Sequence, residues 1–186
     1  MKRAIITPAV LAGAALGELK AWLAITTAGD DAALSALLRM ALETCEAFTG
    51  TMPLVQLCEE IVPAATSWQV LATRPVQAVT WVEGIPDTGA RFAIPVADYA
   101  IDLAADGGAL FRLVQTASST GAADRVAVRF IAGMASGWAD LPESLRHGVL
   151  RLAAHHYRQR ESDSPQAMPP GAIAALWRPW RRMRVA

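Results

Sequence analysis

The spacing of hydrophobic residues changes twice along this chain of 186 residues, and that change limits the folds open to it. From about 31 to 49, apolar residues recur every three or four positions, as on a helix with one buried face. From about 66 to 131 they alternate in short runs separated by Gly, Pro and Asp, which indicates antiparallel strands. Helical spacing returns from 141 to 160. We therefore predict an α+β fold: a helical bundle with an inserted region of short antiparallel strands, then a C-terminal helix plus extended arm.

Local signals suggest where the three helices begin and end. Thr7 and Pro8 combine a hydroxyl N-cap with a proline at the first helical position, which predicts a helix over 7–24. Asp30 or Asp31 is expected to cap the second helix, over 31–49, and Gly50 is expected to end it. The third helix is predicted over 141–160. The stretch 54–62 fits either a strand or a helix.

The predicted helices and strands make one domain over 1–160, followed by a polar, proline-bearing linker at 161–170 and an arm at 171–186. The first residues imitate a secretory signal, with a basic start followed by apolar and small residues. Because the apolar pattern continues beyond any cleavage point, we interpret them as part of the first helix. The chain contains no uninterrupted apolar run of the ~18 residues that a spanning helix needs, so no membrane-spanning helix is expected, and a membrane is not among the expected partners.

The charges are balanced in number but not in position. Seventeen Lys and Arg residues match 17 Asp and Glu residues, so the formal net charge is zero. Residues 1–140 hold 9 basic and 14 acidic residues, a net of −5, whereas residues 141–186 hold 8 and 3, a net of +5. An acidic body with a basic end indicates that the end binds something.

Residues that could carry out catalysis do not form a convincing motif. His147 and His155 would lie two helical turns apart, and His156 adds no acidic neighbour at a useful spacing. Ser136, His147 and Asp140 could be written as a triad, but the G-x-S-x-G motif is absent. The acidic pairs Glu59–Glu60 and Glu43–Glu46 are typical of solvated edges. We expect a protein that is not an enzyme and needs no metal or cofactor, with Cys45 and Cys58 as inert thiols.

The candidate site is the end of the chain, where tryptophan and arginine, the residue types that most often anchor interfaces, gather. Its residues are Leu176, Trp177, Arg178, Pro179, Trp180, Arg181, Arg182, Met183 and Arg184. The segment could dock on a protein partner, grip phosphates with its tryptophans stacked on bases, or lie on a membrane surface. It could also fold back onto its own core.

Four stretches, in this order, carry a family resemblance that covers nearly the whole chain. They are LKAWL at 19–23 with DDAAL at 30–34 and EAFTG at 46–50; RPVQAV at 74–79; VRFIAG at 128–133 with Leu141-Pro142 and YRQRE at 157–161; and MPPG at 168–171 with LWRPWR at 176–181. The set resembles the head–tail connector (adaptor) proteins of long-tailed phages and of gene transfer agents. Thr51-Met52-Pro53-Leu54 departs from the family's usual Arg-Ala-Leu, and Trp180 stands where Tyr is commoner.

This resemblance implies structural work in a virion or phage-like particle. Such adaptors form a ring of twelve copies beneath the portal protein, extend the DNA channel, and meet the next neck or tail protein, a stopper or tail terminator. Their C-terminal segment reaches into the portal, which implies that role for residues 176–184 here. The resemblance further implies assembly in the bacterial cytoplasm and DNA that passes through without sequence-specific binding. The alternative, from another class, is a DNA-binding packaging or regulatory protein that uses the basic arm; a small hydrolase is a weaker third.

Overall fold

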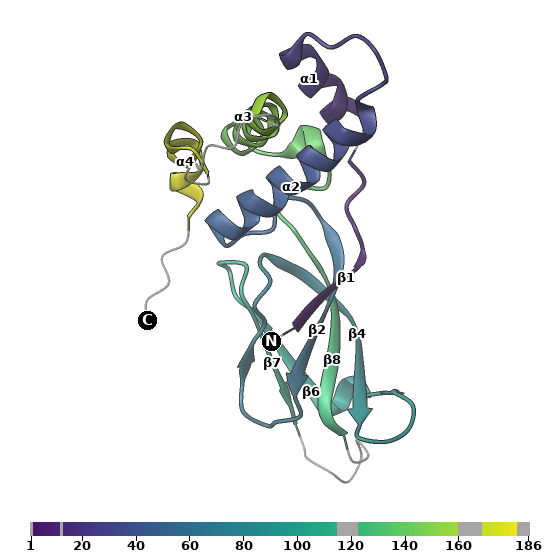
Figure 1. Ribbon diagram of the computed structural model, residues 1–186. Coiled ribbons are helices and arrows are strands. Elements are labelled where there is room, and N and C mark those ends of the chain that lie inside the picture. The colour runs from purple at the N-terminus through teal and green to yellow at the C-terminus, as the bar shows by residue number, and fades with distance from the viewer. Residues whose placement is uncertain (1, 12, 115–122, 160–168, 182–186) are drawn as a thin grey trace. The chain divides into compact units, whose positions relative to one another are not determined.

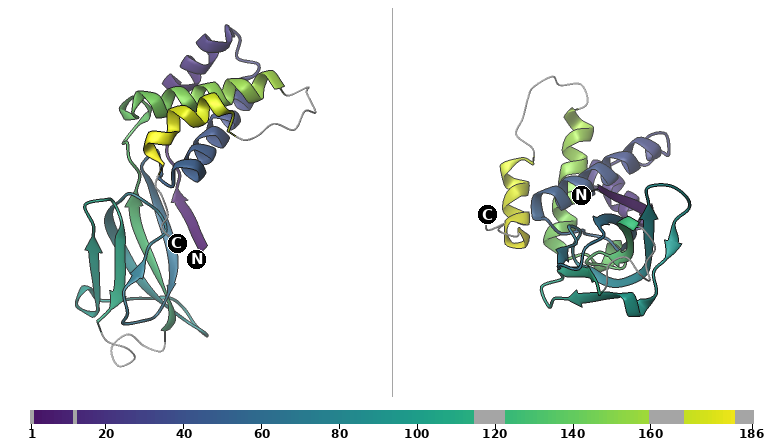
Figure 2. Two further views of the ribbon diagram at one scale, coloured as in Figure 1. Left: turned by 90° about the vertical axis from the view of Figure 1, so that its left-hand side faces the viewer. Right: turned by 90° about the horizontal axis from the view of Figure 1, so that it is seen from below.

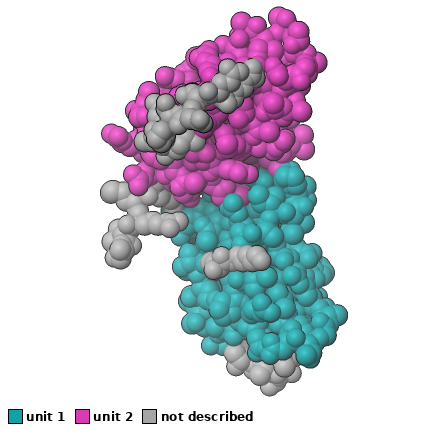
Figure 3. All heavy atoms as spheres, in the orientation of Figure 1, with its two compact units in different colours: residues 1–8, 55–133 teal, residues 9–54, 134–186 magenta. Residues whose placement is uncertain are grey.

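The computed structural model describes residues 2–11, 13–114, 123–159 and 169–181 of the chain (Figure 1). It divides into two compact units (Figure 3). The β unit takes residues 1–8 and 55–133, and the helical unit takes residues 9–54 and 134–186. In sequence, residues 55–133 lie between the second and third helices, and the β unit also contains the N-terminal residues.

The β unit contains two antiparallel sheets (Figure 2). Five strands follow the order β1-β2-β8-β4-β5, and three follow the order β3-β7-β6. Their bounds are β1 Lys2–Thr7, β2 Gln56–Pro63, β3 Gln69–Val70, β4 Val76–Pro86, β5 Phe92–Ala93, β6 Tyr99–Leu103, β7 Ala109–Leu113 and β8 Ala123–Ala132. A short 3-10 turn, η1, spans Val96–Asp98 between β5 and β6.

Alternation along the strands explains the core of the β unit. Strand β8 pairs with β2 on one side and with β4 on the other, so it is central to the larger sheet. Val126, Val128 and Phe130 of β8 are buried, together with Phe111 of β7. The carboxylate of Glu60 is also fully buried, and it accepts hydrogen bonds from the backbone N–H groups of Ala72 and Thr73 and from the Thr73 hydroxyl. Such a buried charge is tolerable because each oxygen has a partner.

The helical unit is built from α1 Gly13–Leu23, α2 Asp31–Thr49, α3 Glu143–Gln159 and α4 Gly171–Trp177. Two 3-10 turns, η2 Trp138–Asp140 and η3 Arg178–Trp180, precede α3 and follow α4. Apolar faces of all four helices meet in one core, to which η2 adds Trp138. Its large side chains include Leu19, Leu34, Leu38, Trp138, Leu145, Leu152 and Trp177.

The second and third helices are confirmed, with α2 at the predicted residues and α3 between Glu143 and Gln159. Gly50 ends α2 in the left-handed conformation, with φ of 73°, and its N–H donates to the carbonyl of Glu46 at 2.8 Å. The start of the first helix was predicted wrongly: residues 2–7 form β1, and α1 begins at Gly13. The uncertain stretch 54–62 is mostly β2, so the strand region begins at 56 instead of 66. Residues 161–168 of the linker lie outside the described residues.

The predicted aspartate cap of α2 is wrong as well. Asp30 occupies the N-cap position, but its side chain makes no capping hydrogen bond. Instead its Oδ2 accepts a hydrogen bond from the Tyr157 hydroxyl at 2.6 Å, and Asp31 pairs with Lys20 at 2.6 Å. Asp31 therefore connects α2 to the neighbouring helix α1, and Asp30 connects it to α3, 127 residues further along the chain.

We expect the Asp30–Tyr157 hydrogen bond to stabilise the helical unit. A hydrogen bond to a charged group contributes about 1.5–3 kcal/mol. A double-mutant cycle with Asp30→Ala and Tyr157→Phe, measured by urea denaturation, should give a coupling energy of about 1.5 kcal/mol. A coupling near zero, with both single variants destabilised, would instead assign Asp30 a purely local role at the start of α2.

Candidate interaction surface

The described part of the C-terminal segment packs onto the helical core. In α4, Ile173 and Trp177 are buried, and Trp177 has no exposed surface. The Trp177 indole N–H points to the carbonyl of Leu145, at 3.4 Å, and its ring lies 6.0 Å from that of Phe48. On α3, a Cβ at Gly148 would lie 2.2 Å from Trp177 Nε1, so only glycine leaves room for the indole. Trp177 is therefore a core residue of this unit.

The residues after α4 continue along the same surface. The Trp180 indole N–H donates to the Ser144 hydroxyl at 2.8 Å, and the Arg181 guanidinium lies 5.4 Å from the centre of the Phe48 ring. Up to Arg181, the segment thus matches the alternative in which it folds back onto its own core. Residues 171–181 therefore pack against the helical unit and do not stand free as an arm. Arg182, Met183 and Arg184 lie outside the described residues.

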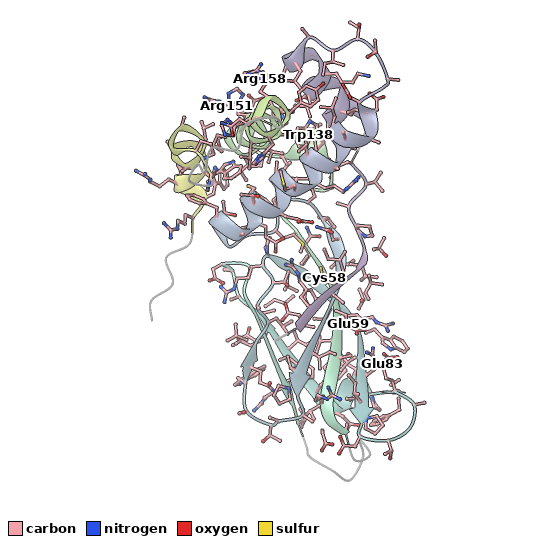
Figure 4. The ribbon with its side chains drawn as sticks, in the orientation of Figure 1. Cys58, Glu59, Glu83, Trp138, Arg151 and Arg158 are labelled. Carbon is pink, nitrogen blue, oxygen red and sulfur yellow. The ribbon has the colours of Figure 1, made fainter. Side chains whose placement is uncertain are left out.

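Packing divides the predicted site residues into two groups. Trp177 is buried, and Leu176 and Trp180 are half-buried, whereas Arg178, Pro179 and Arg181 are exposed. We call the exposed Arg178 and Arg181 the C-terminal basic surface. An open pocket beside it is lined by Thr44, Ala47, Phe48, Pro169 and Arg181. Helix α3 adds Arg151 and Arg158 to the positive charge of this unit (Figure 4).

Replacing Trp177 by alanine should lower the stability of the helical unit. Truncating a large buried aromatic residue costs about 3–5 kcal/mol, because the contacts are lost and a cavity remains. The free energy of unfolding should fall by about that amount in urea denaturation. Arg178→Ala, one residue further on and exposed, is the matched control and should change it by less than about 0.5 kcal/mol. Equal stability of the two variants would contradict the core assignment.

The histidines and the nominal triad do not assemble into a site. The ring of His147 lies edge-on to Trp22 at 5.3 Å, while the Ser136 hydroxyl donates directly to Asp140 at 2.5 Å. His155 and His156 lie side by side. Burial lowers the pKa of His156, and the positive charge of the neighbouring His155 lowers it further.

Burial raises the pKa of Cys45 to about 12, which disfavours the reactive thiolate. Within the described ranges, no three His, Cys, Asp or Glu residues could hold a metal ion. Nor does any helix described here have the length and apolar character to cross a membrane.

Sequence reasoning missed a cluster of four charged residues on the larger sheet. Arg129 of β8 contacts Glu59 of β2 at 2.7 Å and Glu83 of β4 at 3.3 Å, and Arg91 contacts both Glu59 oxygens at 3.0 Å. Figure 4 labels Glu59 and Glu83 on this sheet. Glu59 is buried and paired, so the interpretation of Glu59–Glu60 as a solvated edge is wrong. The residues lie far apart in sequence, and only the strand pairing brings them together.

The cluster should make the β unit sensitive to acid. Burial alone would raise the pKa of Glu59, but hydrogen bonds from Arg129 and Arg91 outweigh it and hold that pKa below its usual value of 4.5. A lowered folded-state pKa means that the stabilisation is complete above the unfolded pKa and is lost as pH falls through the folded one. Glu59→Gln should therefore lose stability at neutral pH and show a flatter decline between about pH 5 and 2 in urea denaturation.

Asp102→Asn, an exposed position on β6, provides the control for this acid titration and should follow the parent protein throughout. A Glu59→Gln variant whose decline with acid is as steep as the parent's would show that the cluster does not set the pH dependence.

Comparison with known proteins points to one kind of assembly. No protein-family model matches the chain, and neither does any curated protein. Solved structures do match. A chain in the neck of an empty gene transfer agent particle, computed with C6 symmetry, is 26% identical with a TM-score of 0.76. A chain in the neck of a native particle, computed with C12 symmetry, is 27% identical with a TM-score of 0.76. A chain in the virion of a native gene transfer agent particle is 26% identical with a TM-score of 0.75.

The match is complete for this chain and nearly complete for the other one. In each case it covers 100% of this chain and 98% of the other chain. Both units and the C-terminal segment are therefore included in the similarity. This full-length likeness supports a structural role in the neck of a phage-like particle, and a place in the virion.

Proposed function

We propose that this protein is a head–tail adaptor of a phage-like particle. In this role it forms a ring in the neck, binds the portal protein, extends the DNA channel and connects the capsid to the tail through a stopper or tail terminator. The observation that carries the proposal is the full-length match, at 26–27% identity, to chains of gene transfer agent necks. Assembly would take place in the bacterial cytoplasm, before the particle is released.

A cyclic homo-oligomer of twelve copies fits the symmetry of one matching neck, which was computed with C12 symmetry. Closed rings are built from heterologous contacts, in which one surface of a subunit meets a different surface of the next. Each copy must therefore present two complementary surfaces to its neighbours, in addition to the surface that meets the portal.

For the portal contact we propose the end of the chain, residues 176–184. Because Trp177 is buried in the helical core, it would hold the segment in place, while Arg178 and Arg181 would meet carboxylates or carbonyls on the portal. Arginine suits this task because its planar guanidinium binds carboxylates through two parallel hydrogen bonds. Residues 1–140 have a net charge of −5, which suits a channel through which DNA slides, because gripping phosphates requires basic residues.

The same basic surface favours a second candidate, a DNA-binding packaging or regulatory protein. Residues 141–186 have a net charge of +5, and Arg178 and Arg181 are exposed. Binding to phosphates releases counterions, so DNA affinity would fall steeply as salt rises. Tight DNA binding with a steep salt dependence would favour this candidate, and weak binding at physiological salt would favour the adaptor.

Truncation after Arg181 tests the portal contact. It removes residues 182–186 and leaves the packed part of α4 and η3 in place. We expect the truncated protein to melt with the parent, while its recovery on heads that bear the portal falls at least tenfold, as when a cluster of arginine contacts is lost. Arg178→Glu with Arg181→Glu should act in the same direction, and Asp102→Asn serves as the neutral control.

Normal recovery of the truncated and charge-reversed proteins on heads would overturn the portal role of this segment. Particles whose necks lack the protein, or hold a single copy, would overturn the adaptor function itself.

A further inference from the structure

In the five-stranded sheet, the edge strand β1 is complementary to the part of β4 that lies beyond its short pairing with β5. We infer that β1 of one copy pairs with the open edge of β4 in the next copy, so that the sheet continues from subunit to subunit. This inference rests on the proposed ring and names the contact that would close it. The partner is a second copy of this chain, because each chain carries both halves of the contact.

The first half is β1, which forms one end of the sheet order; among the residues that the structure describes, β2 is the strand with which it pairs. Natural edge strands are usually blunted by lysine or proline, because unpaired N–H and C=O groups otherwise recruit another strand. Strand β1 begins with Lys2 and Arg3, but its remaining part from Ala4 is free of charge, and the side chains of Ile5 and Ile6 are 44% and 46% exposed. The edge is therefore suited to pairing with another strand.

The second half is the stretch 77–81 of β4. On either side of it the outer edge is already occupied: the Val76 N–H donates to the Gly107 carbonyl, and the Ile94 N–H donates to the Val82 carbonyl, both at 3.0 Å. Between these contacts, the backbone pairs only with β8 among the residues that the structure describes. Ala78 and Trp81 are exposed there, Trp81 to 49%.

The two halves lie at the same position along the strand direction, which we call their height in the sheet. Followed across β2 and β8, the register places Ala4 level with Trp81 and Thr7 level with Ala78. A rotation about an axis roughly parallel to the strands, as in a ring, keeps this height. It would bring β1 of one copy directly against residues 78–81 of the next.

The strand directions agree as well. Every pairing along β1-β2-β8-β4 is antiparallel, so β1 and β4 run in opposite directions. A head-to-tail repeat preserves these directions, and the new β1–β4 pair continues the antiparallel alternation. Pairing of β1 with a second β1 about a two-fold axis would close a dimer and leave both β4 edges open.

Irregularities in β4 limit the length of this contact. The pairing of β4 with β8 shifts register between Val76 and Ala78 and again between Val79 and Trp81. The pairing of β1 with β2 also shifts register, between Ile5 and Thr7. Bulges increase the local twist and can protect an edge from pairing. The apolar Ala78, Val79 and Trp81 favour a short pairing flanked by apolar contact, and a protected edge is the alternative outcome of the test.

Disulfide trapping distinguishes these outcomes. Thr7 and Ala78 are exposed and level with each other, and the native Cys45 and Cys58 are both buried. Thr7→Cys combined with Ala78→Cys should, on mild oxidation, link chains into a ladder that runs well beyond dimers. Mixing the two single variants should give dimers that contain one of each. Thr7→Cys with Asp102→Cys, which uses an edge strand of the other sheet, is the control and should give no ladder.

Mass photometry of the purified protein, and images of necks from particles that carry the variants, report ring formation separately. Rings without a ladder would overturn the β1–β4 contact and leave the adaptor function standing. Absence of both rings and ladder would overturn the two together. Dimers from Thr7→Cys alone would show a two-fold β1 contact and also overturn the inference. Trp81→Lys should lower the ring fraction without lowering the melting temperature, and an unchanged ring fraction would count against the contact.

Discussion

The antiparallel pairing of β2 with β8 is the interaction on which the rest of the chain depends. These are the strands that begin and end the insertion, and they pair from Gln56 with Ala132 to Pro63 with Arg125. Their pairing returns the chain to the point where it left the helices. Immediately beyond it, the N–H groups of Met134 and Ala135 donate to the carbonyls of Met52 and Pro53. Helices α2 and α3 are thereby delivered side by side and can bury their apolar faces in one core. The entropic cost of closing so long an insertion is offset by the strand pairing inside it.

Features governed by neighbouring residues could be predicted from the sequence, whereas those governed by distant residues could not. Helix α2 was predicted correctly because its apolar spacing and Gly50 act locally. The hydroxyl and proline at 7–8 are an equally good local signal, but residues 2–7 pair with β2, some fifty positions away. Asp30 likewise contacts Tyr157 instead of the nearby N–H groups. Local propensity is a weak preference, and tertiary contacts override it.

The C-terminal segment shows the same limit at the candidate site. Its tryptophans and arginines stand out in the sequence, but composition alone does not distinguish a tryptophan that anchors a partner from one that fills its own core. The difference lies in Gly148, which leaves on α3 the space that the Trp177 ring occupies. No pattern within 171–186 could reveal a cavity formed by a helix more than twenty residues earlier. The result is a segment whose two tryptophans pack on the protein itself, while Arg178 and Arg181 are exposed.

The two proposed contacts therefore differ in physical character. On the sheet, Glu59 and Glu83 already have Arg91 and Arg129 as partners, so a neighbouring subunit would gain little by offering charges there. Pairing at the sheet edge would instead rely on backbone hydrogen bonds and on apolar side chains such as Trp81. At 0.1 M ionic strength, salt limits the interaction between exposed charges to a range of about 10 Å. Backbone hydrogen bonds and apolar contacts depend far less on salt. The portal contact, made by exposed arginines, is screened far more. A ring joined through its sheets would hold together under conditions that release it from the portal, because the two contacts depend on different forces.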